Sequence, residues 1–318
     1  MSRLKTLVAN QCGVPPLAAG HSLCQGCGIP LVVRTVLDSI PGRKVVVNAT
    51  GCLEVATTRF PTTAWTLPWL HVAFENGAAV ASGVETAYRA LRRRGVVEEE
   101  ITFVAFAGDG GTYDIGLQAL SGALERGHRF VFCCYDNEAY MNTGVQRSGA
   151  TPPAARTATT PSVGAEPGNV FGQGKNLPLI AVAHEIPYVA TATVADLRDI
   201  EYKVERAMSF HGARYLHLLV TCPLGWGCES AESILVARLA TQCGLFPVFE
   251  AEGGTITAAT TIRRPVPVEE YLKRQKRYAH LFGTTGRPDI VARLQAIADR
   301  NIARFGLFEQ AAEPTGVR

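Results

Sequence analysis

Two short apolar runs lie on either side of a helical pattern in the middle of the chain. ITFVAF (101–106) and RFVFCCY (129–135) are rich in β-branched and aromatic residues and show no polar face, which is typical of strands buried on both sides in a parallel sheet. Between them, a glycine-rich turn leads into an amphipathic helical pattern that ends near Gly127. The order of strand, helix and strand predicts an open α/β sheet.

The same alternation continues on both sides of this unit. It predicts strands at 44–50, 188–194 and 214–222, and helices at 30–40, 74–94, 177–186, 196–210 and 229–242, followed by a hairpin-like segment (246–258) and two terminal helical stretches. Asp196 is the expected N-cap of its helix. Residues 60–72 and 149–176 lack periodicity and are expected to be loops. The fold class that follows is α/β, a doubly wound and mostly parallel sheet with a C-terminal appendage.

The chain is expected to form one main domain with additions at both ends. Residues 1–20 contain Pro15 and Pro16 without periodicity and are interpreted as an arm, 21–245 as the domain, and 246–318 as an extension that packs on partner subunits. The last residues, EPTGVR, are expected to be a disordered tail.

Polar residues follow both central strands at the point where each strand ends. Asp109 lies in the turn after the first strand, between Gly108, Gly110 and Gly111, and Asn137 directly follows the second. Ligands of open α/β sheets bind at this edge, and glycines let a phosphate approach the backbone and the N-terminus of the next helix. An acid among such glycines implies a cation, because carboxylate and phosphate repel; oxygen ligands favour Mg²⁺. A simple turn, with Asn137 capping a loop, is the alternative.

Cysteines form a second group of candidate ligands. Cys24 and Cys27 make a CxxC motif, and Cys52 follows the end of a predicted strand. Three thiolates in a chain without an oxidising context indicate zinc or an iron–sulfur cluster. Cys222, fixed before a proline, is the first candidate for a fourth ligand and Cys228 the second. The remaining cysteines are Cys12, which is left open, and Cys133, Cys134 and Cys243, which are interpreted as core residues.

Composition excludes several classes of function. The chain has 318 residues, of which 47% are hydrophobic and 19% charged, and the excess of basic over acidic residues is 31 − 28 = 3. This small excess does not indicate nucleic-acid binding, and the Arg92–Arg94 patch is interpreted as a helix C-terminus. No apolar run is long enough for a membrane span, and residues 1–12 lack a signal-peptide core, so a cytoplasmic location is expected.

Several motifs resemble one family in a consistent order. GDGGTYDIG (108–116) followed by DNEAYMNTGVQRSGATP (136–152) resembles the thiamine diphosphate motif, and within that superfamily it is similar to the β subunit of pyruvate:ferredoxin oxidoreductase and its 2-oxoacid:ferredoxin relatives. HSLCQGCG, NATGC, PWLHVAFENGAAVASG and TCPLGWG also resemble that subunit, so that the likeness covers residues 15–282. It implies a fold of the thiamine diphosphate-binding type.

The resemblance also implies ligands and roles for individual residues. It assigns Asp109, Asn137 and the carbonyl of Ala139 to Mg²⁺; Gly108, Gly110 and Gly111 to the diphosphate; Thr50, Gly51 and Cys52 to positions along the cofactor; Asn142 to a catalytic place near the thiazolium ring; and Cys24, Cys27, Cys52 and Cys222 to a 4Fe–4S cluster. Relative to the long single-chain pyruvate enzymes, the sequence has Ile29 in place of a glutamate and Asn137 in place of a threonine. Both changes are compatible with the separate-subunit relatives but leave the substrate open.

The implied activity is oxidative decarboxylation of a 2-oxoacid to CO₂ and acyl-coenzyme A, with electrons passing singly to the cluster and then to ferredoxin or another acceptor. Pyruvate is the first choice, with oxalate, 2-oxoisovalerate and phenylglyoxylate as alternatives. The family's activating glutamate and substrate-binding residues lie on other subunits, of α, γ and δ type, so this chain is expected to hold half of a site. A non-redox decarboxylase subunit with zinc, or an assembly subunit without cofactor, are the competing hypotheses.

Overall fold

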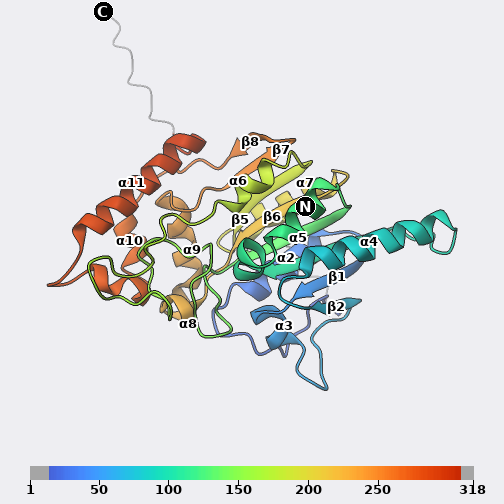
Figure 1. Ribbon diagram of the computed structural model, residues 1–318, viewed down its shortest axis with the longest axis horizontal. Coiled ribbons are helices and arrows are strands. Elements are labelled where there is room, and N and C mark those ends of the chain that lie inside the picture. The colour runs from blue at the N-terminus through green and yellow to red at the C-terminus, as the bar shows by residue number, and fades with distance from the viewer. Residues whose placement is uncertain (1–13, 309–318) are drawn as a thin grey trace, which may run out of the picture.

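The computed structural model describes residues 14–308 and contains one eight-stranded sheet (Figure 1). The strand order is β2-β1-β3-β4-β6-β5-β7-β8, and the first six strands are parallel to their neighbours. The strands are β1 Arg43–Ala49, β2 Trp69–Val72, β3 Ile101–Gly108, β4 Phe130–Asp136, β5 Tyr188–Thr193, β6 Arg214–Leu219, β7 Phe249–Glu252 and β8 Thr255–Ala259. The predicted α/β class with a mostly parallel sheet is confirmed.

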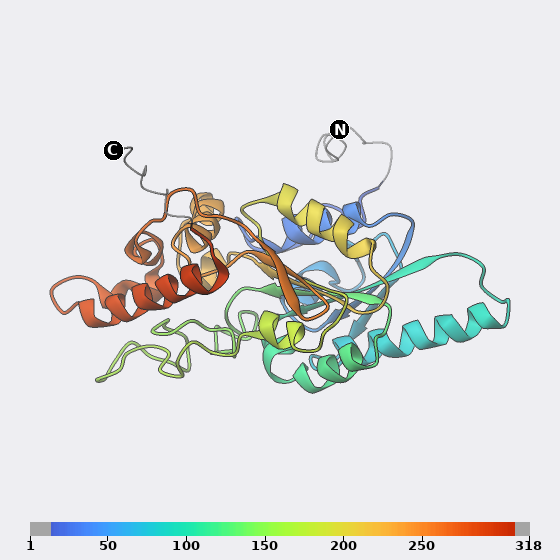
Figure 2. The ribbon, with the colours of Figure 1, turned by 90° about the horizontal axis from the view of Figure 1, so that it is seen from above.

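Helices cover both faces of the sheet, which Figure 2 shows edge-on. The α-helices are α2 Ile29–Ser39, α3 Cys52–Thr57, α4 Gly77–Arg93, α5 Leu117–Glu125, α6 Leu177–Val182, α7 Leu197–Met208, α8 Pro223–Trp226, α9 Ser233–Gln242, α10 Val268–Leu272 and α11 Pro288–Phe305; shorter turns are η1 Gly110–Asp114, η2 Ser230–Glu232 and η3 Lys276–Leu281. Alternate residues of the central strands pack on α2 and α7 on one side and on α4, α5 and α6 on the other. This double burial explains why the strands have no polar face.

A third core lies beside the sheet and is formed mainly by α9, α10 and α11. The hairpin β7–β8 connects this region to the sheet, because β7 pairs antiparallel with β5. The segment after residue 245 therefore contributes two strands to the main sheet as well as helices. Residues 1–13 and 309–318 lie outside the described residues. The expectations that residues 1–12 lack a signal-peptide core and that EPTGVR is a disordered tail fall on these residues and stay predictions.

Three predicted boundaries are wrong. Residues 60–72 are not all loop, because Trp69–Val72 forms strand β2 on the outer side of β1. The helix expected from Phe74 begins at Gly77 instead. Strand β6 ends at Leu219 rather than at Cys222, and Cys222 is the N-cap of α8 with Pro223 in its first turn, a position where the missing N–H of proline is harmless.

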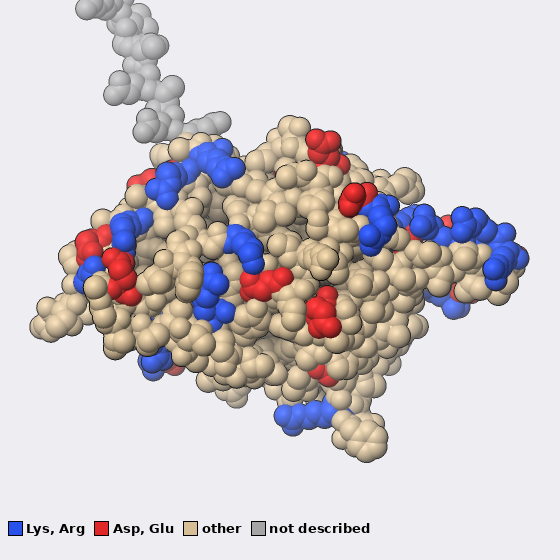
Figure 3. Space-filling view, viewed as in Figure 1, with Lys and Arg blue, Asp and Glu red and all other residues tan. Residues whose placement is uncertain are grey.

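On the face seen in Figure 3, basic and acidic side chains are mostly interspersed. Figure 3 shows basic side chains gathered on the protruding end of α4, where Arg92 and Arg93 occupy the last helical turn. Arg92 pairs with Glu100 at 3.4 Å, and Arg43 pairs with Glu99 at 2.8 Å. Within the described residues, no helix combines the length and the apolar character needed to cross a bilayer.

The N-cap of α7 provides a test of local stability. Asp196 accepts hydrogen bonds from the backbone N–H groups of Arg198 and Asp199, both at 3.1 Å, as its sequence position predicted. We expect Asp196→Ala to lower the free energy of unfolding by about 1 kcal/mol, measured by denaturant titration. Glu125→Ala at the exposed end of α5 removes a carboxylate without removing a cap and is the control.

Candidate active site

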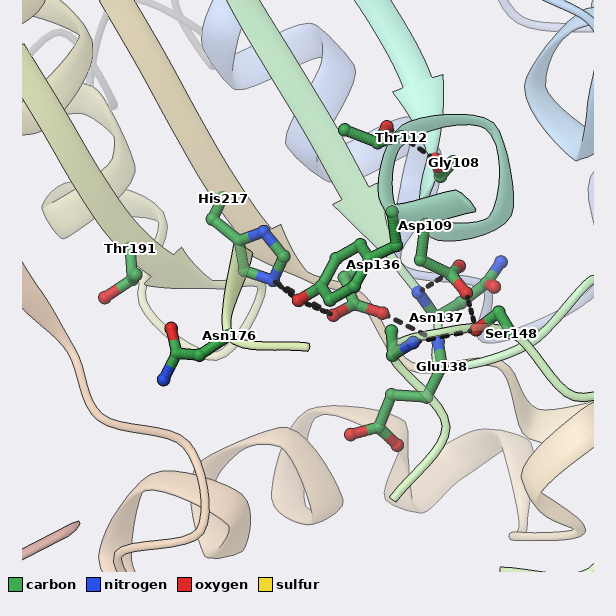
Figure 4. Close-up of polar contacts among 12 residues, drawn as sticks. Gly108, Asp109, Thr112, Asp136, Asn137, Glu138, Ser148, Asn176, Thr191 and His217 are labelled. Atoms are coloured by element: carbon green, nitrogen blue, oxygen red, sulfur yellow. Dashed lines mark hydrogen bonds and ion pairs between the residues drawn. The ribbon is translucent and has the colours of Figure 1, made fainter. Parts of the chain in front are cut away.

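Asp109 and Asn137 meet at the carboxyl edge of two adjacent strands (Figure 4). Gly108 pairs with Tyr135 in the parallel register of β3 and β4, which brings the residues after them together. The backbone N–H of Asn137 donates to Asp109 Oδ1 at 3.3 Å, and Ser148 Oγ donates to Asp109 Oδ2 at 2.5 Å. Asp109 and Asn137 are 1% and 4% exposed, so the predicted pair forms a buried polar centre.

Three oxygen positions converge beside Asp109. In one orientation of the Asn137 side-chain amide, its oxygen lies 2.9 Å from both the Ala139 carbonyl oxygen and Asp109 Oδ1; in the other, its NH₂ group donates to both. Adjacent oxygens in an octahedral Mg²⁺ site, each about 2.0–2.1 Å from the metal, lie about 2.9 Å apart. The Asn137 side-chain oxygen is therefore spaced from each of the other two predicted ligands as adjacent ligands of Mg²⁺ are.

A charged Asp109 side chain is electrostatically unfavourable in these surroundings when no cation is near it. Burial raises the pKa of Asp109 well above its ordinary value, and the charge of Asp136 raises it further. Asp136 is itself held by His217, whose Nε2 lies 2.9 Å from Asp136 Oδ2, and His217 Nδ1 contacts the Tyr215 hydroxyl at 2.9 Å. A positive ion beside Asp109 would offset the repulsion between the two buried carboxylates.

A cavity of about 300 Å³ opens beside this polar centre. It is lined by nearly every cofactor residue expected from the sequence and by five that the sequence analysis missed: Thr50, Gly51, Cys52, Gly108, Asp109, Gly110, Asn137, Ala139 and Asn142, together with Phe74, Tyr135, Tyr140, Met141 and Thr143. The cavity is polar at the Asp109 end and largely apolar elsewhere. That arrangement suits a ligand with an aromatic body whose anionic end approaches Asp109 through an intervening cation.

The glycines of this cavity make room for aromatic side chains. A Cβ atom on Gly51 would lie 2.7 Å from the Tyr135 hydroxyl, and one on Gly110 would lie 2.2 Å from the Tyr140 ring. Larger residues at either position would displace these walls. Gly111 packs against Phe74 instead of lining the cavity, and the π-helical turn η1 begins immediately after Asp109.

His71 lies next to the cavity rather than in the core. Its Nε2 is 2.7 Å from Thr50 Oγ1 and 3.7 Å from Glu54 Oε2, and its ring stacks on Trp69. Because Thr50 lines the cavity, His71 orients one of its walls. The sequence alone did not distinguish this position from that of a packed core histidine.

Four cysteines are neighbours, and one of them, Cys52, lines the same cavity. Burial raises the pKa of Cys27 to about 12, and the nearby thiols of Cys222, Cys52 and Cys24 contribute to the increase. Burial likewise raises the pKa of Cys52 to about 12, with Cys222 and Cys24 acting in the same direction. The N–H of Gly28 donates to Thr221 O at 3.1 Å, which holds the CxxC segment against the segment of Cys222.

The other described cysteines have different surroundings. Cys133, Cys134 and Cys243 are buried in the hydrophobic cores, as expected, and Cys12 lies outside the described residues. Between residues 14 and 308, no three His, Cys, Asp or Glu side chains form a group that could hold a single metal ion. The four thiols are thus neighbours without being a closed single-ion site.

The fold and the cavity correspond to a known class of domain. The family model described as "Thiamine pyrophosphate enzyme, C-terminal TPP binding domain" matches residues 49–218, a stretch that contains Asp109, Asn137 and both strands that carry them. The parallel sheet with its acidic, glycine-rich edge is therefore a thiamine diphosphate-binding domain.

Similar proteins identify the family within this class of domain. "Pyruvate synthase subunit PorB" of Methanothermobacter marburgensis is 51% identical over 265 residues, which are 83% of this chain and 90% of that protein. "Ketoisovalerate oxidoreductase subunit VorB" of Pyrococcus furiosus is 43% identical over 265 residues, 83% of this chain and 85% of that protein. The chain belongs to the family of β subunits of 2-oxoacid:ferredoxin oxidoreductases, as its motifs predicted.

A solved structure agrees with this fold. A 2-oxoglutarate:ferredoxin oxidoreductase from Magnetococcus marinus aligns with a TM-score of 0.52 and 20% sequence identity, covering 86% of this chain and 92% of that one. At this level of identity the comparison supports the fold alone. The division of the chain into arm, domain and extension stays a prediction, as do the roles of individual site residues.

Proposed function

We propose that this subunit binds thiamine diphosphate with Mg²⁺ and a 4Fe–4S cluster, and that its complex oxidises pyruvate with coenzyme A to acetyl-coenzyme A and CO₂. The observation that carries the proposal is the position of Cys52. It lines the same cavity as Asp109 and is also a member of the group of four thiols. A cofactor in the cavity and a cluster on the thiols would therefore be adjacent, which suits direct electron transfer.

Each residue group has a separate task in this proposal. Asp109, Asn137 and the Ala139 carbonyl hold Mg²⁺, and the backbone around Gly108 and Gly110, which line the cavity, holds the diphosphate. Thiamine diphosphate, when bound, supplies the electron sink that permits loss of CO₂. Asn142 lines the same cavity and is assigned to the reacting end. The apolar walls from Phe74, Tyr140 and Met141 exclude water there.

The site is incomplete within this chain. The cavity residues within the described part of the chain include no glutamate, whereas thiamine enzymes need one beside the pyrimidine ring. We assign that glutamate and the ligands of the substrate carboxylate to partner subunits of α, γ or δ type, and we place the complex in the cytoplasm with ferredoxin or another one-electron carrier as acceptor.

The isolated chain should therefore show no turnover, less than about 1% of the rate of the complex. Turnover by the purified chain alone would contradict this.

The reaction is tested on the purified complex. Pyruvate, 2-oxoisovalerate, oxalate and phenylglyoxylate are offered in turn, with coenzyme A present or absent, and reduction of a viologen dye is measured. We expect pyruvate with coenzyme A to give the highest kcat/KM, in line with the relatives named as pyruvate synthase subunits. A preference for 2-oxoisovalerate would place the chain with the ketoisovalerate enzymes instead. Zinc in place of iron and acid-labile sulfide would favour a non-redox decarboxylase.

A further inference from the structure

The loop that presents the proposed magnesium ligands has a disfavoured backbone conformation. Glu138, between Asn137 and Ala139, has φ of 69°, in the left-handed region that residues with a Cβ seldom adopt. Its N–H donates to Asp136 Oδ1 at 2.8 Å, and its carbonyl accepts from Thr151 Oγ1 at 2.7 Å. Such a conformation persists where surrounding contacts over-determine it.

The segment after Cys222 holds the same loop from another side. Trp226 in α8 is fully buried, and its Nε1 donates to the carbonyl oxygen of Asn137 at 2.8 Å. Because Cys222 is the N-cap of α8, this hydrogen bond ties the segment of a proposed cluster ligand to the segment of a proposed metal ligand. The two halves of the proposed site therefore share one support.

Arg277 contacts both elements of this support. It is 4% exposed and lies in η3, within the C-terminal segment. Its Nη2 forms an ion pair with Glu138 Oε2, and its guanidinium lies 4.2 Å from the centre of the Trp226 ring. The carboxylate of Glu138 points away from Asp109 in Figure 4, so this ion pair does not compete with the proposed magnesium site.

The rest of the guanidinium is also held in place. Arg277 Nε donates to Gln275 Oε1 at 2.9 Å, and Nη2 donates to the Tyr271 hydroxyl at 3.2 Å. η3 is attached to the end of α8 by the N–H of Lys276, which donates to Gly227 O at 3.1 Å. A planar, forked cation can pair with a carboxylate and stack on an indole at once, whereas a lysine ammonium cannot do both in this geometry.

We propose that Arg277 is a positioning residue for the divalent cation of the thiamine site. By holding Glu138 in the left-handed conformation and Trp226 against Asn137, it sets the spacing of the Asn137 and Ala139 oxygens from Asp109. The inference rests on the proposed magnesium-dependent function. It assigns to the C-terminal segment a part in the site, although that segment lines none of the cavity around Asp109.

Mg²⁺ and Ca²⁺ differ in how much distortion of their coordination geometry they tolerate, and this difference gives a specific readout. Mg²⁺ requires near-ideal octahedral geometry, whereas Ca²⁺ accepts flexible coordination at longer distances. A loop with loosened geometry should therefore lose Mg²⁺-supported cofactor binding more than Ca²⁺-supported binding. General damage to the fold would weaken both to the same degree.

The experiment measures thiamine diphosphate binding to the assembled complex after divalent ions have been removed by a chelator. MgCl₂ or CaCl₂ is titrated, and binding is followed by intrinsic tryptophan fluorescence. For Arg277→Met we expect the half-saturating Mg²⁺ concentration to rise by about 10-fold or more and that of Ca²⁺ by less than about 3-fold, with Arg277→Lys also impaired. Arg274→Met is the matched control, since Arg274 pairs with Glu232 at 2.6 Å and has no contact with Glu138, and it should change neither value.

A second variant separates positioning from folding. Arg277→Met alone leaves the Glu138 carboxylate buried without its partner, whereas Glu138→Gln with Arg277→Met removes that charge as well. The double variant should fold into the complex and still show the selective loss for Mg²⁺. Equal losses for both cations, in either variant, would overturn the inference. A wild-type complex that binds no thiamine diphosphate with either cation would overturn the proposed function itself, and this inference with it.

Discussion

Asp109→Asn should abolish magnesium-dependent cofactor binding while making the cofactor-free protein more stable to heat. The loss is expected because an amide contributes one neutral oxygen where a carboxylate contributes charge, and we expect at least on the order of 100-fold weaker binding of Mg²⁺ and thiamine diphosphate. The gain is expected because Asp109 is buried beside Asp136, which makes its charge costly when no cation is present.

Cofactor affinity is expected to fall while thermal stability rises, and this combination makes the prediction specific to a cation site. Thermal unfolding of the cofactor-free complex and titration with thiamine diphosphate and MgCl₂ are measured on the same preparations. Asp114→Asn is a useful comparison, because Asp114 lies on the same turn but pairs with Lys175 at 2.6 Å, outside the oxygen cluster. Asp114→Asn should retain magnesium affinity and gain no stability. A less stable Asp109→Asn protein with unchanged cofactor affinity would show that Asp109 has only a structural role.

The centre of the site could be predicted because periodicity and chain order determine it. Two buried strands joined by one helix must be parallel, so Asp109 and Asn137 had to come to the same edge of the sheet. The same logic located Asp196, whose role as an N-cap depends only on neighbouring residues. In both cases, the physical cause acts over a short stretch of chain.

The supports of the site could not be predicted, because they come from distant segments. Ser148, Trp226 and Arg277 contact Asp109, Asn137 and Glu138 through tertiary packing. Ser148 and Trp226 lie in motifs that resemble the family, but no local pattern indicates which residues they contact. Strand β2 was missed for a related reason. Its four residues follow Pro68 in an aromatic loop and form a strand only because β1 offers a free edge.

The group of four cysteines could be predicted from the sequence only in part. The CxxC spacing places Cys24 and Cys27 together, but the pairing of that motif with Cys52 and Cys222 depends on where α2, α3 and α8 begin relative to the sheet. In the structure the thiol of Cys222 acts on the pKa of both Cys27 and Cys52, whereas Cys228 does not figure among the groups that shift either. The order of preference between Cys222 and Cys228 stays a prediction.

Exchanging each of these two cysteines for serine should therefore have very different effects. Cys222→Ser should lower the iron and acid-labile sulfide content of the complex and reduce pyruvate-dependent viologen reduction by at least about 100-fold, because a serine hydroxyl replaces a soft thiolate ligand. Thiamine diphosphate binding should persist, since serine also caps a helix N-terminus and α8 can keep Trp226 against the carbonyl of Asn137. Cys228→Ser should keep iron, sulfide and most of the activity.

Metal analysis, visible absorbance and electron paramagnetic resonance of the reduced complex distinguish the two variants. If Cys228→Ser lost the iron while Cys222→Ser kept it, the fourth ligand would be Cys228, and the segment after α8 rather than its N-cap would face the cluster. If neither variant lost iron, no cluster would depend on this part of the chain, and the adjacency of Cys52 to both halves of the site would have no electron-transfer role. The pair thus tests the proposed link between the thiol group and the cavity.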